Sequence, residues 1–357
     1  MSAIAAVITG LGAALPPDRI TNEQLVREGL DTSDAWIRGR TGIESRHRVR
    51  PGTSTGDLAV AAARGALESA GAHDAGLLIL ATTTPDRRCP ATAPELAARL
   101  GMTGIPAFDL AAVCSGFVYA AAVASALLMA GAYDSVLLVA AETYSTIVDP
   151  RDRETAVIFG DGAGAAYLTR GQRRDPGALV HFDLGSDGTG SDLITIPAGG
   201  SRLPYTDELP LQERYFRMRG REVYARAVRQ MAASSRTVLD RAGWTTDSVA
   251  AFVAHQANQR ILDSVADRLG IPPDRCHGNL REVGNTAAAS LPLALADTAA
   301  RGAVRQGART LLTAFGGGLT WGSIAMTWPE VKPVRHTPQP RPIHKEFDSC
   351  LPSTTTS

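Results

Sequence analysis

Short runs of apolar residues alternate along this chain with longer alanine-rich stretches whose apolar positions recur with helical spacing. The runs predict buried strands and the stretches predict helices. In the first half, strands are expected at 5–10, 77–82, 135–141 and 156–159, and helices at 55–70, 93–100 and 115–130. In the second half, strands are expected at 249–254 and 309–314, and helices at 220–242, 260–269 and 291–301. This alternation predicts an α/β fold in which helices cover the sheets.

A polar, turn-rich stretch at 171–177 divides the pattern into two α/β parts of similar size. We therefore predict an N-terminal half at 1–172 and a C-terminal half at 173–328. Residues 329–357 are rich in proline, threonine and charge and have no apolar periodicity. Such a segment buries too little apolar surface to offset its chain entropy, so a flexible tail is expected there.

The segment 111–131 is long enough to cross a bilayer and contains no charged residue. Its alanine and small polar residues, with no aromatic belt and no basic flank, instead predict a helix buried in the protein core. The N-terminus has neither a basic segment nor a cleavage-site pattern, so no secretory signal is expected. We therefore expect a cytoplasmic protein that does not bind a membrane.

Composition and charge argue against several classes of protein. The 36 basic and 36 acidic residues give a formal net charge of zero, which disfavours a nucleic-acid-binding protein held by a general positive field. The four cysteines are far apart and lack metal-ligand spacing, so we expect reduced thiols, no disulfide and no metal. The glycine-rich segments at 10–12 and 160–165 lack the full dinucleotide fingerprint, so no nucleotide cofactor is expected.

Cys114 is the first candidate for chemistry. A strand-like run at 106–110 leads through the sequence AAVCSGF into the long apolar helix, which places Cys114 at or near a helix N-terminus. The positive end of the helix dipole favours a thiolate there, and a thiolate is the nucleophile that attacks a thioester carbonyl. The alternative is that Cys114 is a small buried hydrophobic residue, the common fate of a lone cysteine.

Two further candidates are His255 and Asn285. His255 ends a buried strand within the sequence AHQAN, a place where sites form in α/β proteins, and it could donate a hydrogen bond or act as a general base. Asn285 lies in GNTAAAS before a predicted helix. Taken alone, His255 could be satisfied by backbone contacts, and Asn285 could cap a helix or a turn.

Taken together and in this order, the three motifs resemble the ketoacyl-acyl-carrier-protein synthase III family of the thiolase superfamily. The resemblance extends to Trp328 and includes the N-terminal signature TSDAWI with RTGI, and the glycine-rich segments FGDGAGA and FGGGLTWG. It implies a thiolase-like fold, with two similar α/β halves forming a layered α-β-α-β-α core, and a homodimer.

The resemblance also implies a reaction. Cys114 takes an acyl group from acyl-CoA, and malonyl-acyl carrier protein then enters. His255 and Asn285 donate hydrogen bonds to its thioester oxygen and stabilise the enolate formed as carbon dioxide leaves. The backbone N–H groups of Cys114 and Gly317 form a second oxyanion hole, and the 3-ketoacyl product primes fatty-acid or polyketide synthesis. Acyl-CoA is a substrate, and no cofactor is implied.

A different class of reaction on the same scaffold remains open. An acyltransferase would move the acyl group to a hydroxyl, an amine or a carrier thiol without decarboxylation. His255 would then deprotonate the acceptor.

The resemblance carries over substrate contacts residue by residue. Trp36 and Arg40 would sandwich the adenine of coenzyme A, Arg153 would lie near the nucleotide, and Asn258 would contact the pantetheine. Gly220 lies in the segment of the pantetheine tunnel, and Arg260 and Arg221 would dock the acidic carrier protein. The surrounding arginine cluster could serve that attraction, or could simply be a solvated helix face: Arg217, Arg219, Arg221, Arg226, Arg229.

The chain departs from the family pattern at three positions. Arg221 stands where an asparagine is typical and Ala225 where a lysine is found. Cys89 occupies a position often filled by a phenylalanine that reaches across the dimer and limits the acyl pocket. The smaller side chain predicts room for a longer or branched starter.

Overall fold

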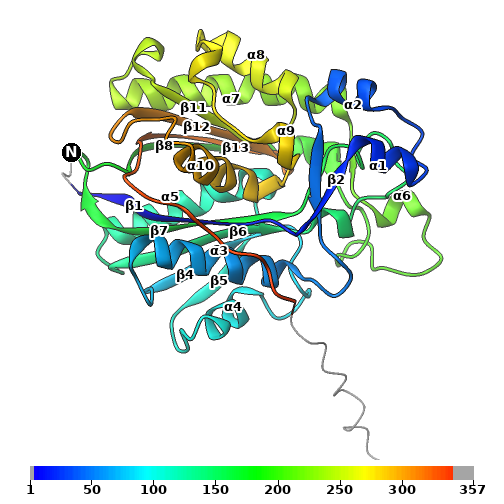
Figure 1. Ribbon diagram of the computed structural model, residues 1–357, viewed down its shortest axis with the longest axis horizontal. Helices are drawn as coiled ribbons and strands as arrows, with labels where there is room; N and C mark the ends of the chain where they lie inside the picture. The colour runs from blue at the N-terminus through cyan, green and yellow to red at the C-terminus, as the bar shows by residue number, and fades with distance from the viewer. Residues whose placement is uncertain (1–3, 341–357) are drawn as a thin grey trace, which may run out of the picture.

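A continuous mixed sheet forms the centre of the computed structural model, which describes residues 4–340 (Figure 1). The elements of the first part are β1 (Ile4–Ala14), β2 (Asp18–Thr21), α1 (Asn22–Arg27), α2 (Asp34–Thr41), β3 (Ser45–Arg48), α3 (Thr55–Ala70), β4 (Leu77–Ala81), α4 (Ala93–Arg99), β5 (Ala107–Leu110), α5 (Gly116–Met129), β6 (Ser135–Glu142) and β7 (Gly162–Gln172). The elements of the second part are β8 (Ala178–Ser186), β9 (Ile194–Thr195), α6 (Leu211–Arg214), β10 (Arg217–Met218), α7 (Gly220–Ala242), β11 (Ala251–Ala254), α8 (Gln259–Leu269), α9 (Leu280–Val283), α10 (Ser290–Ala300), β12 (Arg309–Gly316), β13 (Thr320–Thr327) and β14 (Val334–Arg335).

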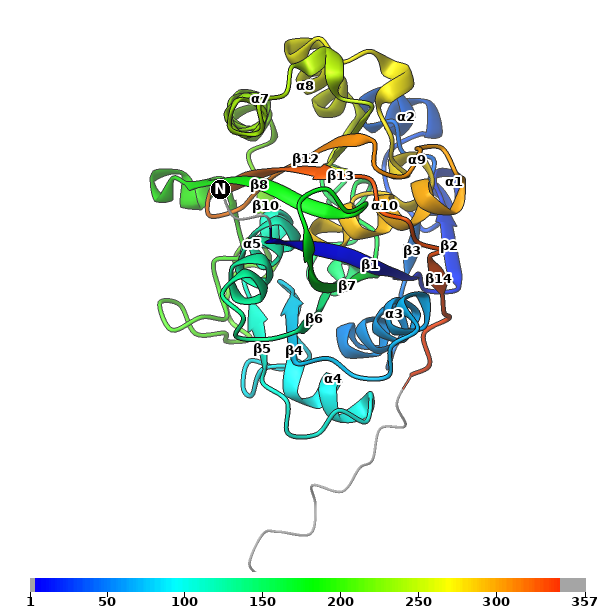
Figure 2. The same cartoon turned by 90° about the vertical axis from the view of Figure 1, so that its left-hand side faces the viewer.

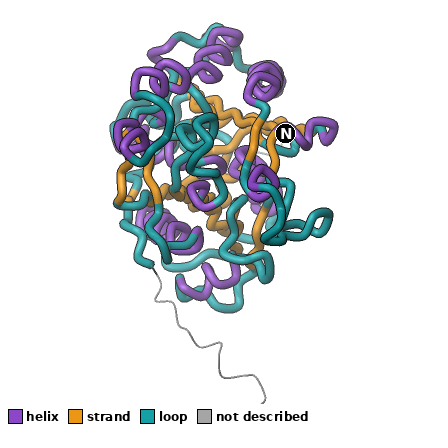
Figure 3. Tube along the Cα trace, turned by 90° about the vertical axis from the view of Figure 1, so that its right-hand side faces the viewer, coloured by secondary structure: helices purple, strands orange, loops and turns teal. Residues whose placement is uncertain are grey.

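The strand order is β11-β12-β13-β8-β1-β7-β6-β4-β5, with β14 added beside β1. Figure 2 shows the sheet folded into two layers that alternate with three helical layers. Helices α7 and α8 lie outside β12, β13 and β8, helices α5 and α10 lie between the strand layers, and α3 and α4 cover the other side. The opposite view shows the same strands enclosed by helices and loops (Figure 3). The predicted α/β, thiolase-like layering is confirmed.

The strand layers meet at β1. One edge of β1 pairs with β7 along nearly its whole length, and on the other edge Ala6 and Val7 pair with β8. The strands β5, β4, β6, β7 and β1 precede residue 173, and β8, β13, β12 and β11 follow it. The division into two halves at residue 172 stays a prediction.

Helix α5 explains the apolar segment at 111–131. It packs against β1, β4 and β6 and also against β8 and β13, so both of its faces meet a sheet. These contacts require apolar residues on most of the helix, and only one edge, with Val123 and Met129, is exposed. The prediction of a buried core helix is confirmed, and among residues 4–340 no helix is long and apolar enough to cross a membrane.

A local prediction differs from the structure. Residues 156–159 form turns rather than a strand, and Phe159 makes only an isolated bridge with Asn285. Their apolar side chains pack beside Cys114. A run of apolar residues looks the same in the sequence whether it forms a strand or a buried turn. Of the glycine-rich segments, 317–319 form the turn between β12 and β13, whereas Gly162 and Gly164 lie within β7. A Cβ on Gly164 would lie 2.8 Å from the backbone nitrogen of Leu293, so this glycine admits α10 rather than turning the chain.

Part of the predicted flexible tail packs against the protein. Strand β14 pairs in parallel with β1, the Lys332 carbonyl accepts a hydrogen bond from Ser69, and Arg335 forms an ion pair with Asp297 of α10. Backbone groups of β1 that β8 leaves unpaired supply the partners for this strand, and His336 N donates to the Ala13 carbonyl. The remainder of the predicted tail, 341–357, lies outside the described residues.

The contact between β1 and α3 provides a test of this packing. A Cβ on Gly12 would lie 2.0 Å from the Ala62 carbonyl oxygen, so Gly12→Ala should lower the free energy of unfolding by about 1–3 kcal/mol in urea denaturation. The matched control is Gly39→Ala, whose Cβ would meet nothing within 4 Å in exposed helix α2. It should leave stability unchanged or raise it by up to about 1 kcal/mol. Equal effects of the two substitutions would contradict the close packing.

Candidate active site

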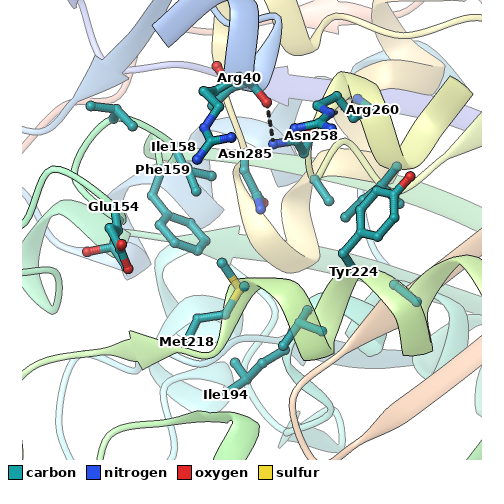
Figure 4. Close-up of a pocket in the computed structure, with 18 of the residues that line it drawn as sticks. Arg40, Glu154, Ile158, Phe159, Ile194, Met218, Tyr224, Asn258, Arg260 and Asn285 are labelled. Atoms are coloured by element: carbon teal, nitrogen blue, oxygen red, sulfur yellow. Dashed lines mark hydrogen bonds between the residues drawn. The ribbon is translucent and has the colours of Figure 1, made fainter. Parts of the chain in front are cut away.

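A cavity of about 770 Å³ opens between the first and second parts of the chain (Figure 4). Its walls come from α2, the turn before α5, the 153–159 segment, α7, α8 and the turn before α10. Ten of the residues predicted for the site line it: Trp36, Arg40, Cys114, Arg153, Gly220, Arg221, His255, Asn258, Arg260 and Asn285. The structure therefore brings nearly all of the predicted site residues to one place.

Cys114 lies in a 3-10 turn, η1 (Val113–Ser115), directly before α5, which confirms its predicted place at a helix N-terminus. Val113 has φ of 47°, a left-handed conformation that a β-branched residue rarely adopts. Such strain persists only where the surroundings hold it, and it occurs most often at functional sites. Gly316 is part of those surroundings, because a Cβ there would lie 2.7 Å from the Cys114 nitrogen.

The electrostatic setting of the Cys114 thiol differs from the expectation. Burial raises its pKa, and the carboxylate of Glu142 raises it further, while a backbone hydrogen bond acts in the opposite direction. Desolvation and the Glu142 charge outweigh the backbone hydrogen bond, so the resting side chain is a thiol. The helix dipole alone does not describe this nucleophile.

His255 follows β11, with its backbone N–H bonded to the Thr313 carbonyl at 2.8 Å. Its Nδ1 lies 2.6 Å from the Ser290 hydroxyl oxygen, which accepts a hydrogen bond from the Gln256 N–H at 3.3 Å. We assign the Ser290 hydroxyl as the donor to Nδ1, which leaves the ring's own proton on Nε2. Burial lowers the pKa of His255 to about 3. The imidazole is therefore neutral and presents an N–H donor.

Asn285 is held by both its backbone and its side chain. Its backbone N–H donates to the Ile158 carbonyl at 2.9 Å, and its carbonyl accepts from Gly160 at 3.0 Å. The side-chain oxygen accepts from the Ala287 N–H at 2.8 Å. With the oxygen engaged in this way, the NH₂ group is left as a donor for a ligand in the cavity that Asn285 lines.

The mouth of the cavity is basic and aromatic. The Arg40 and Arg153 guanidinium carbons lie 5.6 and 4.6 Å from the centre of the Trp36 ring. Asn258 uses both ends of its amide: its nitrogen donates to the Arg40 carbonyl at 3.1 Å, and its oxygen caps α8 through the Arg260 N–H at 3.0 Å. Figure 4 shows Arg40, Asn258 and Arg260 on the same side of the cavity. Such a platform suits a flat, negatively charged ligand.

Two predicted residues do not line the cavity, namely Cys89 and Gly317. Cys89 is exposed on the loop before α4 and does not reach the cavity of its own chain. Gly317 packs on Ile194, which is a cavity residue, with 3.1 Å from its Cβ position to the Ile194 side chain. The proposed roles of both residues stay predictions.

The arginine cluster on and before α7 is partly neutralised. Arg217 pairs with Glu213, Arg219 with Glu222, and Arg226 with Asp187. Arg221, by contrast, lines the cavity. Most of the cluster is therefore an ion-paired surface, and Arg221 is the member that faces the cavity.

Sequence reasoning missed an aromatic wall and a positioning hydroxyl. Phe159 and Phe216 line the cavity, and Tyr144 stacks on Phe159 with ring centres 4.6 Å apart. Tyr144 and Phe216 belong to no motif, and Phe159 begins the FGDGAGA segment, which gives no sign that its side chain lines a cavity. Ser290 ends the GNTAAAS motif, so its place was visible although its contact with His255 was not.

The chain is similar to known proteins along most of its length. The family model for the 3-oxoacyl-[acyl-carrier-protein (ACP)] synthase III C terminal matches residues 239–328, and that for 3-oxoacyl-[acyl-carrier-protein (ACP)] synthase III matches residues 108–188. The chain is 58% identical over 330 residues to beta-ketoacyl-[acyl-carrier-protein] synthase III 2 of Streptomyces coelicolor, covering 92% of this chain and 96% of the relative. It is 50% identical to the beta-ketoacyl-[acyl-carrier-protein] synthase III of Pseudomonas aeruginosa, covering 92% and 98%.

Solved structures give the same result. The crystal structure of 3-oxoacyl-(acyl carrier protein) synthase III from Pseudomonas aeruginosa superimposes with a TM-score of 0.86 at 49% identity, covering 92% of this chain and 100% of the other. A priming beta-ketosynthase from a polyketide biosynthetic pathway has a TM-score of 0.84 at 33% identity, covering 91% and 96%.

Within residues 4–340, no group of three or more His, Cys, Asp or Glu side chains could hold a metal ion.

The state of His255 can be measured directly. Long-range ¹H–¹⁵N spectra should show the neutral Nε2–H tautomer from about pH 7 down to about pH 5, because burial lowers the pKa of this ring to about 3. Loss of the signal in His255→Asn would assign it. Ser290→Ala should populate the Nδ1–H tautomer, since the hydroxyl that donates to Nδ1 is gone. A signal that titrates near pH 6.5, the ordinary value for histidine, would contradict this assignment.

Proposed function

This chain belongs to the 3-oxoacyl-[acyl-carrier-protein] synthase III family, and on that premise we propose that it condenses an acyl-CoA starter with malonyl-acyl carrier protein. The product is a 3-ketoacyl carrier thioester that primes fatty-acid or polyketide synthesis. One observation carries the proposal: a cysteine at a helix N-terminus and two neutral N–H donors, from His255 and Asn285, line the same cavity.

The first half-reaction is acylation of Cys114. The thiol loses its proton, and the sulfur attacks the thioester carbonyl of acyl-CoA. The backbone N–H groups of Cys114 and Gly317 receive the developing oxyanion. The bond to coenzyme A then breaks, the acyl group remains on Cys114, and the coenzyme leaves as a thiol with the proton.

The second half-reaction uses the two donors. His255 Nε2–H and the Asn285 amide bond the thioester oxygen of malonyl-acyl carrier protein. The bond to the carboxylate breaks, carbon dioxide leaves, and the electron pair forms an enolate that these donors stabilise. Its carbon attacks the acyl thioester, the carbon–sulfur bond breaks, and the Cys114 thiolate that leaves takes a proton from solvent water. Neutral donors suit this step because, unlike a buried charged donor, they do not require an ion of opposite charge beside them in the cavity.

The cavity mouth provides for the substrates. Trp36, Arg40 and Arg153 would hold the adenine nucleotide of coenzyme A, while Gly220 and Asn258 would border the pantetheine. Arg221 and Arg260 would attract the acidic carrier protein. We also propose a cytoplasmic homodimer, as the family resemblance implies, in which Cys89 of one chain borders the acyl pocket of the other and leaves room for a longer starter.

Plain acyl transfer is the weaker candidate. It requires a base that removes a proton from the acceptor. His255 carries its proton on Nε2 and has a pKa lowered to about 3, so it is a poor base. The same features favour hydrogen-bond donation to an enolate.

Intact-mass spectrometry separates the two half-reactions. A panel of acyl-CoAs should load the wild-type protein with one acyl group, and malonyl-acyl carrier protein should discharge it with release of carbon dioxide. Cys114→Ala should form no adduct. His255→Ala and Asn285→Ala should still load, but should release carbon dioxide at least about 100-fold more slowly.

An adduct that survives malonyl-acyl carrier protein in the wild-type protein would overturn the condensation and favour acyl transfer. The acyl-CoA that loads fastest would identify the starter. Preference for acetyl-CoA over every longer chain would contradict the role given to Cys89.

Carrier docking is tested by Arg260→Glu. This reversal of charge at the cavity mouth should raise the KM for malonyl-acyl carrier protein roughly tenfold at low salt, with a smaller effect at about 0.5 M salt because charges at the surface are screened. The value of kcat at saturating carrier should change little. Arg305→Glu, an exposed arginine away from the cavity, is the control and should leave KM unchanged. Equal effects at both positions would contradict a specific docking role.

A further inference from the structure

Glu142 is a fully buried carboxylate that the reaction described above does not use. It ends β6, is 0% exposed, and takes part in none of the ion pairs formed by residues 4–340. Burying a carboxylate costs much free energy unless hydrogen bonds compensate its charge. The groups that donate to Glu142 therefore indicate its role. The Thr83 N–H lies 3.1 and 3.0 Å from its two oxygens, and the Thr84 hydroxyl donates at 2.9 Å.

A third donor comes from the other part of the chain. The backbone N–H of Ala288 faces the Glu142 carboxylate and stabilises its charged form. Ala288 is the middle residue of a 3-10 turn, η6 (Ala287–Ala289), which packs against β6. The carboxylate thus connects the end of one strand to a turn that is more than a hundred residues away in the sequence.

This turn carries the donors of the second half-reaction. Asn285 precedes it and is fixed by the Ala287 N–H, and Ser290 follows it and fixes the tautomer of His255. Ala287 has φ of 45°, so the turn is strained and needs contacts that hold it. A shift of the turn would misdirect both donors at the same time.

We infer that Glu142 is a positioning residue for decarboxylation: its carboxylate holds the 285–290 turn so that Asn285 and the Ser290–His255 pair aim their N–H groups at the thioester oxygen. This inference rests on the proposed function. Glu142 does not touch the substrate.

The groups that face Glu142 predict opposite effects on the two half-reactions. The 82–84 segment and the 287–289 turn offer it no titratable side chain, whereas the turn before α5 offers Cys114 and the segment after β6 offers Tyr144. The negative charge of Glu142 raises the pKa of both groups. Removing the charge should therefore ease ionisation of Cys114 while it loosens the turn.

The ionisation of Glu142 should also be visible in the pH dependence. Burial raises its pKa to about 7, so the carboxylate gains a proton as the pH falls through that value. A protonated carboxyl accepts hydrogen bonds less well, and the hold on the turn weakens. Decarboxylation by the acylated enzyme should then decline below pH 7. His255 does not cause this decline, since its pKa is about 3.

Glu142→Gln provides the test, with Glu208→Gln, an exposed loop position outside the cavity, as the matched control. Intact-mass kinetics measure acylation of Cys114, and release of labelled carbon dioxide from malonyl-acyl carrier protein is followed with pre-acylated protein. Glu142→Gln should load at the wild-type rate or faster, and should release carbon dioxide about 10–100-fold more slowly. Its release rate should be flat from about pH 6 to about pH 8, whereas the wild-type and control rates fall towards acid.

Equal losses in both half-reactions, or an unchanged release rate, would overturn the inference. If Glu142→Gln does not fold, as judged by circular dichroism, the wild-type pH profile decides, and a release rate that is flat through pH 7 overturns the inference. Failure of the proposed function gives a different result, because the wild-type protein would then release no carbon dioxide at any pH.

Discussion

The close approach of three backbone segments around Cys114 is the constraint on which the rest of the structure depends. The turn before α5, the turn before α10 and the end of β12 meet with almost no side-chain volume between them. A Cβ on Gly316 would lie 2.7 Å from the Cys114 nitrogen, and one on Gly116 would lie 3.2 Å from the Ala288 methyl group. Thr320 and Ser115 then join the segments, with Thr320 donating to the Ala112 carbonyl and Ser115 to the Thr320 carbonyl. Only glycine, alanine and small hydroxyl residues permit this geometry.

The same tight packing keeps His255 and Cys114 uncharged before substrate enters, while Glu142 is charged above about pH 7. Burial lowers the pKa of His255 to about 3, raises that of Cys114, and brings that of Glu142 to about 7. A medium of low polarity removes charges that lack partners. Charge that develops later on a substrate oxygen meets fixed N–H dipoles and few competing ions. Interactions of this kind are stronger in a dry cavity than in water, which is the setting an enolate requires.

The sequence predicted the local elements well and the long-range contacts poorly. Helix α3 begins at Thr55 and ends at Ala70, as its periodicity predicts, because a capping box at Ser54 and a left-handed Gly71 mark its ends. Residues 156–159 form turns, since apolar burial alone does not distinguish a strand from a packed turn. Cys114, His255 and Asn285 were recognised by their motifs. The contacts of Ser290 and Glu142 join residues 35 and more than a hundred positions apart, and no periodicity encodes them.

The two half-reactions place opposite demands on this cavity. Acylation needs a thiolate, which burial and the Glu142 charge both oppose. Decarboxylation needs two donors held still, which burial and the same charge support. An enzyme can satisfy both demands only if the thiolate is a transient species that forms as acyl-CoA arrives, while the donor geometry is permanent. On the proposed mechanism, the strained turn at Ala287, the buried carboxylate and the serine hydroxyl hold the donors, while the helix terminus and a backbone hydrogen bond favour the thiolate.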